Sequence, residues 1–108
     1  MLSIERQVYL DDAAAPVEAN DTPGCTHFPF AALDEAEKAR VASLTPTEAA
    51  AFALQDRRDA GLFVEPSKGD AIIFFNTDAA GETDPLSLHA ATRANAVKHV
   101  ANFWLRLS

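Results

Sequence analysis

Cysteine is nearly absent from this chain, which contains one, Cys25, among 108 residues. A single cysteine excludes an internal disulfide and suits a reducing compartment. A small buried side chain is a more common role for a lone cysteine than a reactive thiol. We therefore expect Cys25 to be structural and the protein to be cytoplasmic.

Basic residues and long apolar runs are scarce as well. Nine lysines and arginines stand against sixteen acidic residues, and the formal charge of −7 disfavours binding to phosphate backbones. Apolar runs such as residues 71–75 are far too short to cross a bilayer, and residues 1–10 contain no sustained apolar run. The sequence thus predicts a soluble, unexported protein with neither nucleic acid nor a membrane as its partner.

The motifs of several enzyme classes are also missing. The sequence has no Cys-x-x-Cys pair, glycine-rich phosphate loop or Gly-x-Ser-x-Gly elbow, so zinc-ribbon, nucleotide-binding and serine-hydrolase functions have no support. What it does have is a hydrophobic fraction of 48% with seven phenylalanines, which predicts a packed globular core. A chain of this length has room for one domain at most.

Local patterns predict strands in both halves of the chain and helices between them. Residues 6–10 are rich in β formers, whereas 34–43 contain good helix formers. Thr45-Pro46-Thr47-Glu48 is a capping-box sequence with proline at the first helical position, and it predicts a helix from 46 to about 60. Further strands are predicted at 62–65, 70–77, 86–91 and 97–107.

Three blocks in the second half of the sequence form a specific pattern. Residues 64–76 contain a Pro-x-x-Gly-Asp turn followed by an apolar strand. Gly81 and an Asp-Pro pair then lead to His89, and residues 98–106 begin with a lysine and contain a tryptophan. This pattern resembles the closing half of the catalytic domain in the prolyl 4-hydroxylase family of iron(II)/2-oxoglutarate dioxygenases.

A weaker match lies earlier in the chain. Residues 24–29 resemble the family's Gly-Gly-Glu-Thr-x-Phe-Pro block, with Cys25 in place of the acid, and residues 6–12 resemble the strand and acidic turn before it. The resemblance implies a mainly β fold, namely a partial double-stranded β-helix (jelly-roll) with antiparallel sheets and a helical insertion at about 31–60. Residues 1–108 would be the C-terminal part of such a domain.

The resemblance also implies a reaction. It points to an oxidoreductase that hydroxylates a peptidyl-prolyl or related substrate with Fe(II), dioxygen and 2-oxoglutarate, and it makes L-ascorbic acid a further candidate cofactor. The substrate itself, a protein or a small molecule, is not identified by any loop sequence here.

Three residues are candidates for the site. The resemblance makes His89 a metal ligand, and strand alternation places it away from the neighbouring leucines. By the same resemblance Lys98 binds the distal carboxylate of 2-oxoglutarate, and Trp104 follows it on the same strand face. The alternatives are a partly exposed histidine without a ligand, a lysine that points to solvent and a tryptophan at a rim. We read His27 and His99 as structural.

One family motif is missing altogether. His-x-Asp, the first metal motif of the family, occurs nowhere in the sequence, and no residue is assigned as a catalytic acid or base. Either the motif lies upstream of Met1, or the chain is a noncatalytic jelly-roll remnant that acts as a protein-interaction module. Missing strands would leave an apolar face uncovered around Ile72, Phe74 and Phe103, so we expect self-association or poor solubility of the chain alone.

Overall fold

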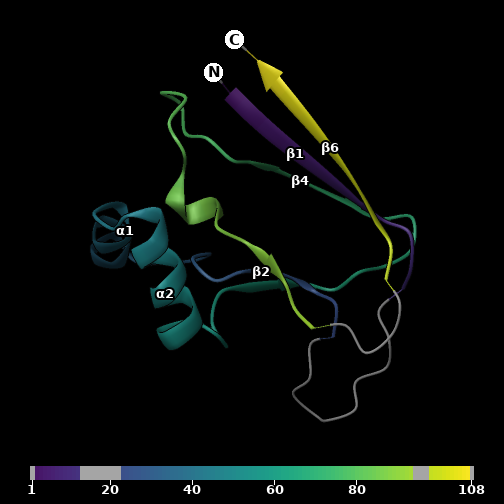
Figure 1. Cartoon of the computed structure of the whole chain (residues 1–108), viewed down its shortest axis with the longest axis horizontal. Helices are drawn as coiled ribbons and strands as arrows, with labels where there is room; N and C mark the ends of the chain where they lie inside the picture. The colour runs from purple at the N-terminus through teal and green to yellow at the C-terminus, as the bar shows by residue number, and fades with distance from the viewer. Residues whose placement is uncertain (1, 13–22, 94–97, 108) are drawn as a thin grey trace.

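Two three-stranded antiparallel sheets form the framework of the computed structural model, which describes residues 2–12, 23–93 and 98–107 (Figure 1). The first sheet has the strand order β4-β1-β6 and the second has the order β3-β2-β5. The expected antiparallel arrangement is therefore confirmed. The strands are β1 (Leu2–Tyr9), β2 (Thr26–Phe28), β3 (Leu62–Val64), β4 (Ala71–Phe75), β5 (Ala90–Ala91) and β6 (Val100–Leu107).

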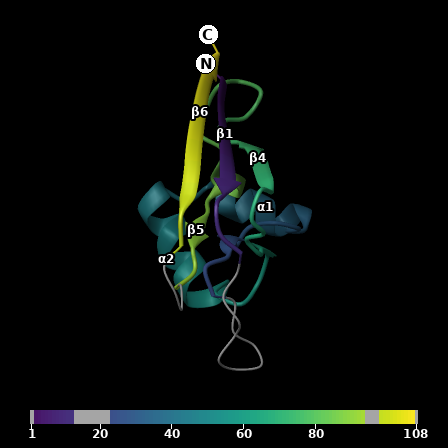
Figure 2. The same ribbon diagram turned by 90° about the vertical axis from the view of Figure 1, so that its right-hand side faces the viewer.

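The first strand of the chain lies in the middle of the first sheet. It pairs along its whole length with β6, from Leu2 opposite Leu107 to Tyr9 opposite Val100, so the two ends of the described chain lie side by side (Figure 2). Its other edge pairs with β4. Because both edges of β1 are hydrogen-bonded, its side chains are held between those of two neighbours.

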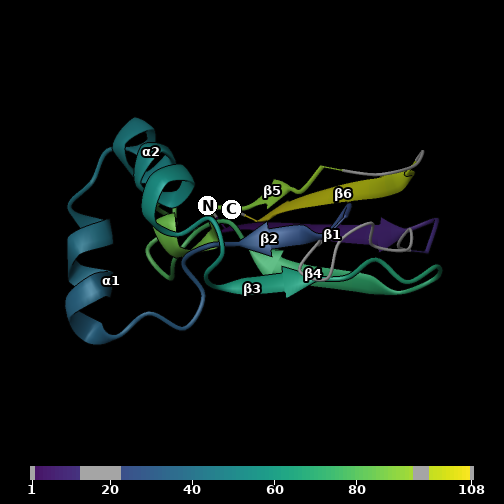
Figure 3. The ribbon, with the colours of Figure 1, turned by 90° about the horizontal axis from the view of Figure 1, so that it is seen from below.

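The two faces of this sheet differ sharply. On one face, Glu5 lies opposite Phe74 of β4 and Trp104 of β6. Phe74 packs against Phe28 of β2, so this inner face is turned toward the second sheet, which lies against the first in Figure 3. The other face, called the outer face below, is apolar apart from one arginine. It consists of Ile4, Arg6, Val8, Ala71, Ile73, Phe75, Ala101, Phe103 and Leu105.

Two helices follow β2 and lie at one end of the sheets, within the predicted helical region (Figure 1). They are α1 (Glu35–Ala42) and α2 (Pro46–Asp56). The capping box predicted at Thr45 and Glu48 is present, and Asp34 with Glu37 forms a second one. None of the described helices is both long and apolar enough to cross a membrane.

The predicted extent of α2 is wrong at its C-terminal end. The helix ends at Asp56 rather than near residue 60. Arg57 leaves the helical conformation at φ −124° and its Nε donates a 3.0 Å hydrogen bond to the carbonyl oxygen of Pro29. This contact ties the helix end to the chain after β2. Gly61 then takes a positive φ of 89°, where a side chain would collide with the backbone of Phe28 and Pro29.

The predicted strand at 86–91 is also only partly present. Residues Pro85–Ser87 form a 3₁₀ turn, and the strand is reduced to Ala90–Ala91. The Asp84 side chain accepts a 2.9 Å hydrogen bond from the backbone N–H of Leu86, which caps the turn, and Pro85 has the φ that such a turn needs. This local capping overrides the apolar pattern that suggested a strand.

The apolar core lies beneath the helices rather than between the sheets. Its buried members are Phe30, Leu33, Val41, Ala49 and Ala53. The side chains buried between the sheets include polar ones, namely Glu5, Gln7 and Thr26. The interior thus contains buried polar side chains beside aromatic ones such as Phe28 and Phe74, whereas the exterior of the first sheet is apolar, which departs from the usual distribution.

Candidate functional site

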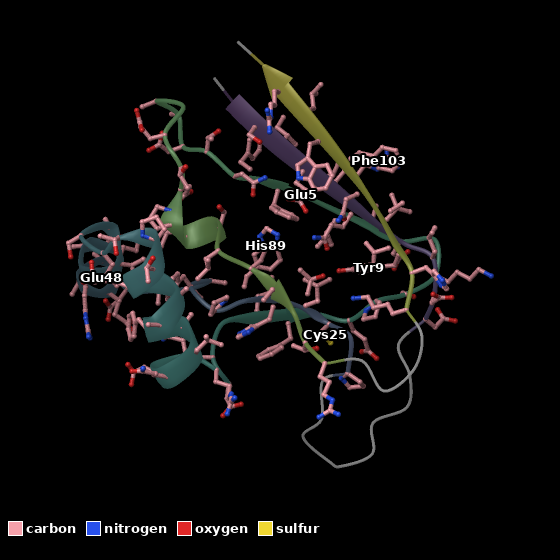
Figure 4. The ribbon with its side chains drawn as sticks, in the orientation of Figure 1. Glu5, Tyr9, Cys25, Glu48, His89 and Phe103 are labelled. Atoms are coloured by element: carbon pink, nitrogen blue, oxygen red, sulfur yellow. The ribbon has the colours of Figure 1, made fainter. Side chains whose placement is uncertain are left out.

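The three residues predicted from the sequence all lie against the polar interior between the sheets. Nε1 of Trp104 donates a 3.0 Å hydrogen bond to Oε1 of Glu5. Nε2 of His89 lies 3.8 Å from Oε2 of the same carboxylate (Figure 4). Nζ of Lys98 lies 5.5 Å from the centre of the Tyr9 ring. The structure thus places His89, Lys98 and Trp104 around one set of β1 side chains.

Glu5 is the centre of this arrangement, and the sequence reasoning missed it. Its exposed fraction is only 5%, and Gln7 and Asn76 also donate to its carboxylate, over 3.0 and 3.4 Å. The predicted strand began at residue 6, whereas β1 begins at Leu2. A strand predicted from residue 2 would have placed Glu5 and Gln7 together on the face opposite Ile4 and Val8. This alternation of polar and apolar residues was the signal from which Glu5 could have been identified.

A chain of hydrogen bonds links Glu5 to Tyr9. Nε2 of Gln7 donates to Oε2 of Glu5, and Oε1 of Gln7 accepts from the Thr26 hydroxyl over 3.0 Å. The Tyr9 hydroxyl lies 2.7 Å from the Thr26 oxygen. Because the single proton of Thr26 is given to Gln7, Tyr9 must be the donor in this last contact. The hydrogen bonds are therefore all donated in one direction, from Tyr9 through Thr26 and Gln7 to the carboxylate of Glu5.

Lys98 lies beside Tyr9, at one end of this series of hydrogen bonds. Its ammonium donates to the carbonyl oxygen of Gly24, and no carboxylate of the described residues is within ion-pair distance of it. Burial lowers the pKa of Lys98, and a charged Cys25 thiol would act in the opposite direction. Burial also raises the pKa of the Tyr9 hydroxyl. An anion arriving here would meet a partly desolvated ammonium that lacks a counter-charge.

His89 lies at the opposite end and is held in a fixed orientation. Its Nδ1 is 2.9 Å from the carbonyl oxygen of Ser87. Since a carbonyl can only accept, Nδ1 carries the proton, and in the neutral ring Nε2 presents its lone pair toward Glu5. The rings of Phe28 and Phe74 flank the imidazole with centroids at 5.5 and 4.6 Å.

The other two histidines have different surroundings. His27 stacks on Phe63 at 4.0 Å, and its Nε2 lies 2.6 Å from the carbonyl oxygen of Ala60. His99 pairs with Asp11 on the exposed surface at 2.9 Å, and hydrogen bonds from the His99 backbone and side chain lower the pKa of Asp11. Cys25 is buried, as predicted.

The described residues contain no group of three His, Cys, Asp or Glu side chains that could hold a metal ion. They do bring one imidazole and one carboxylate together at His89 and Glu5. A two-histidine, one-carboxylate ligand set would therefore need a further histidine beyond this pair. The hydrogen bonds from Tyr9 through Thr26 and Gln7 to Glu5 thus run from the region beside Lys98 to the Glu5–His89 pair. No family model matches this chain, and no curated protein shows significant similarity to it.

Proposed function

We propose that this chain forms the co-substrate-binding part of an iron(II)/2-oxoglutarate dioxygenase domain of the prolyl 4-hydroxylase type, folded as part of a jelly-roll. One observation carries the proposal. His89 comes from one block of the sequence and Lys98 and Trp104 from the next, and all three meet the Glu5–Tyr9 side of β1 between two facing antiparallel sheets.

Lys98 is the residue that would bind 2-oxoglutarate. A carboxylate that replaced the Gly24 carbonyl as its partner would supply a full counter-charge to a partly buried ammonium. The Tyr9 ring adjoins this ammonium, but its hydroxyl already gives its single proton to Thr26, so Lys98 is the donor for the ligand. The distal carboxylate of 2-oxoglutarate is a compact anion. It would supply the negative charge that the described residues around Lys98 do not provide.

The metal end of the proposal rests on His89. Fe(II), when bound beside 2-oxoglutarate, would activate dioxygen for hydroxylation of a protein or small-molecule substrate. The contribution of this chain is to orient the imidazole, through Ser87 and two phenylalanine rings, and to keep Nε2 unprotonated in the neutral form. The second histidine of the usual ligand set is not among the described residues.

Binding of 2-oxoglutarate by the metal-free chain tests this proposal. Isothermal titration should show binding that Lys98→Met weakens at least about tenfold, because the substitution removes the ammonium that would pair with the ligand carboxylate. Lys38→Met is the matched control, since Lys38 lies on α1 and pairs with the exposed Glu35 at 3.3 Å. Equal loss in both variants, or no binding by the wild-type chain, would contradict the proposal.

The outer face supports a second candidate function, a protein-interaction module. Ile73, Phe75, Phe103 and Leu105 are each more than half exposed on this face. The expected uncovered face is therefore present at Phe103. It was wrongly assigned for Ile72 and Phe74, which are partly buried, and Phe74 packs against Phe28 and His89. Single sheets rarely leave so many apolar side chains uncovered.

Arg6 indicates what would cover the outer face. It is exposed in the central strand of this face, with its guanidinium 6.0 Å from the centre of the Phe103 ring, and the face contains no acidic residue. A second copy docked face to face would bury two arginines without a carboxylate. The proposed occupant is therefore an amphipathic helix of a partner protein with a carboxylate opposite Arg6.

A charge exchange tests the interaction module. A model helical peptide with an apolar face should bind the wild-type chain more tightly with a central glutamate than with a central lysine, and Arg6→Glu should reverse this order. An unchanged order would show that the guanidinium does not select the partner.

A further inference from the structure

We propose that Glu5 and His89 form a two-ligand site for a divalent transition-metal ion, in which Glu5 supplies a carboxylate from a position that no sequence motif assigns. The inference rests on the proposed function for the identity of the metal, Fe(II), because imidazole with carboxylate suits several first-row ions. The ligand pair itself follows from the contacts of the two side chains.

The distance between the two side chains suits a shared ion. Oε2 of Glu5 and Nε2 of His89 are 3.8 Å apart, which is longer than a hydrogen bond. Two ligands that each lie about 2.1 Å from one metal ion are separated by about 3.0 Å at a right angle and by about 4.2 Å when opposite each other. The observed separation falls between these limits, so an ion could enter with little movement of either side chain.

His89 has the supporting contact that metal-bound histidines usually have. Such a histidine donates its other ring N–H to a carbonyl or carboxylate, which fixes the tautomer and the direction of the free nitrogen. Nδ1 of His89 donates to the carbonyl oxygen of Ser87 in this way, over 2.9 Å. Nε2 is left as the ligand atom, and it faces Glu5.

Glu5 has one coordination position left. A carboxylate has about four lone-pair directions, and Trp104, Asn76 and Gln7 use three of them. All three donors are neutral groups, so the charge of this buried carboxylate is not balanced by a lysine or arginine among the described residues. A cation next to the remaining lone pair would supply that balance.

The chain contains a matched contrast to this pair. His99 and Asp11 also form a histidine–carboxylate pair, but their atoms are 2.9 Å apart, which is hydrogen-bond distance. Both side chains are exposed, at 66% and 39%. The interacting atoms of this surface pair already satisfy one another, and we expect the pair to bind metal weakly or not at all.

Trp104 provides a built-in probe. It is the only tryptophan of the chain, and its indole donates directly to Glu5. Co(II) alone, added to the metal-free chain, should therefore quench its fluorescence in a saturable manner. Glu5→Gln and His89→Ala should each weaken the apparent affinity by about tenfold or more, as loss of one of two protein ligands leaves mainly water around the ion.

Two variants keep the test decisive. His99→Ala should titrate like the wild-type chain, because its pair lies elsewhere. His89→Gln replaces the imidazole with a polar side chain and serves if circular dichroism shows that Glu5→Gln or His89→Ala has not folded. Unsaturable quenching of the wild type, or wild-type affinity in folded Glu5→Gln or His89→Gln, would overturn the site.

The two proposals fail separately. If Co(II) does not bind but 2-oxoglutarate still binds in a Lys98-dependent manner, the Glu5–His89 site is wrong and the proposed function survives. If Co(II) binds through Glu5 and His89 while 2-oxoglutarate does not bind, the metal site stands and the co-substrate assignment is wrong.

Discussion

Trp104 and Glu5 lie directly opposite each other on β6 and β1, and the indole N–H of the first is hydrogen-bonded to the carboxylate of the second. This cross-strand contact joins a residue predicted for the site to one that was not. The contact involves a buried negative charge on the central strand of the sheet. The free-energy cost of burying that charge depends on the hydrogen-bond donors around it.

Trp104→Phe should lower the free energy of unfolding by about 1 kcal/mol, because Glu5 loses one donor. The effect is kept small by the 60% exposure of Trp104, which allows water to replace the indole N–H. Urea unfolding followed by far-ultraviolet circular dichroism measures it without relying on fluorescence. Phe103→Leu, a change on the neighbouring outer-face residue, is the control and should lie within about 0.5 kcal/mol of wild type.

Thr26→Val should destabilise the protein more than Tyr9→Phe. The first change leaves both the Tyr9 hydroxyl and the Gln7 oxygen without their buried partner and should cost about 2 kcal/mol or more. The second removes a donor while Thr26 keeps its bond to Gln7, and it should cost about 1 kcal/mol. Chemical denaturation of the two variants gives the order, and the reverse order would argue against the direction assigned to the hydrogen-bonded chain.

Lys98 should make stability depend on pH in the alkaline range. Its pKa is lowered from 10.5 in the folded chain, so between the folded value and 10.5 the unfolded chain binds more protons and stability rises with pH. The cost of the buried charge is fully present below the folded pKa. In Lys98→Met this dependence is absent. As the pH rises through this range, the free energy of unfolding of the wild type should therefore increase relative to that of Lys98→Met.

Denaturation of both proteins at a series of pH values measures that difference directly. The raised pKa of Tyr9 acts in the opposite direction above 10.0, because the folded chain then retains the proton longer. That contribution is common to wild type and variant and cancels in the comparison. A constant difference across the series would show that the Lys98 ammonium is not desolvated.

Self-association of the isolated chain should depend on the outer face. Ile73→Thr with Phe103→Thr keeps β-forming residues but removes two large exposed apolar side chains, and it should lower the weight-average mass in sedimentation. Leu54→Thr is the control, because Leu54 is 69% exposed on α2, away from this face. Association that responds equally to both changes would show that it is nonspecific. We expect it to be weak in the wild type, since Arg6 opposes close pairing of two outer faces.

Several features were predictable from the sequence because their causes are local. The start of α2 depends on Thr45, Pro46 and Glu48, which lie within one turn, and the capping box forms as expected. Strand alternation likewise placed Trp104 on the inner face of the last strand, where it meets Glu5, whereas Lys98 lies before β6, which begins at Val100 rather than at the predicted residue 97. Such features need only the geometry of a single element.

Other features depend on which elements meet. The N-terminal strand lies between β4 and β6, which brings Glu5 beside Trp104, and the packing of the second sheet on the first brings His89 to the same carboxylate. The end of α2 is decided by a contact from Arg57 to the chain after β2. The sequence by itself determined the helix starts, the strand periods and the residue types of the site. Tertiary structure decided which strand face became the interior, because alternation separates two faces but only the second sheet determines which of them it covers.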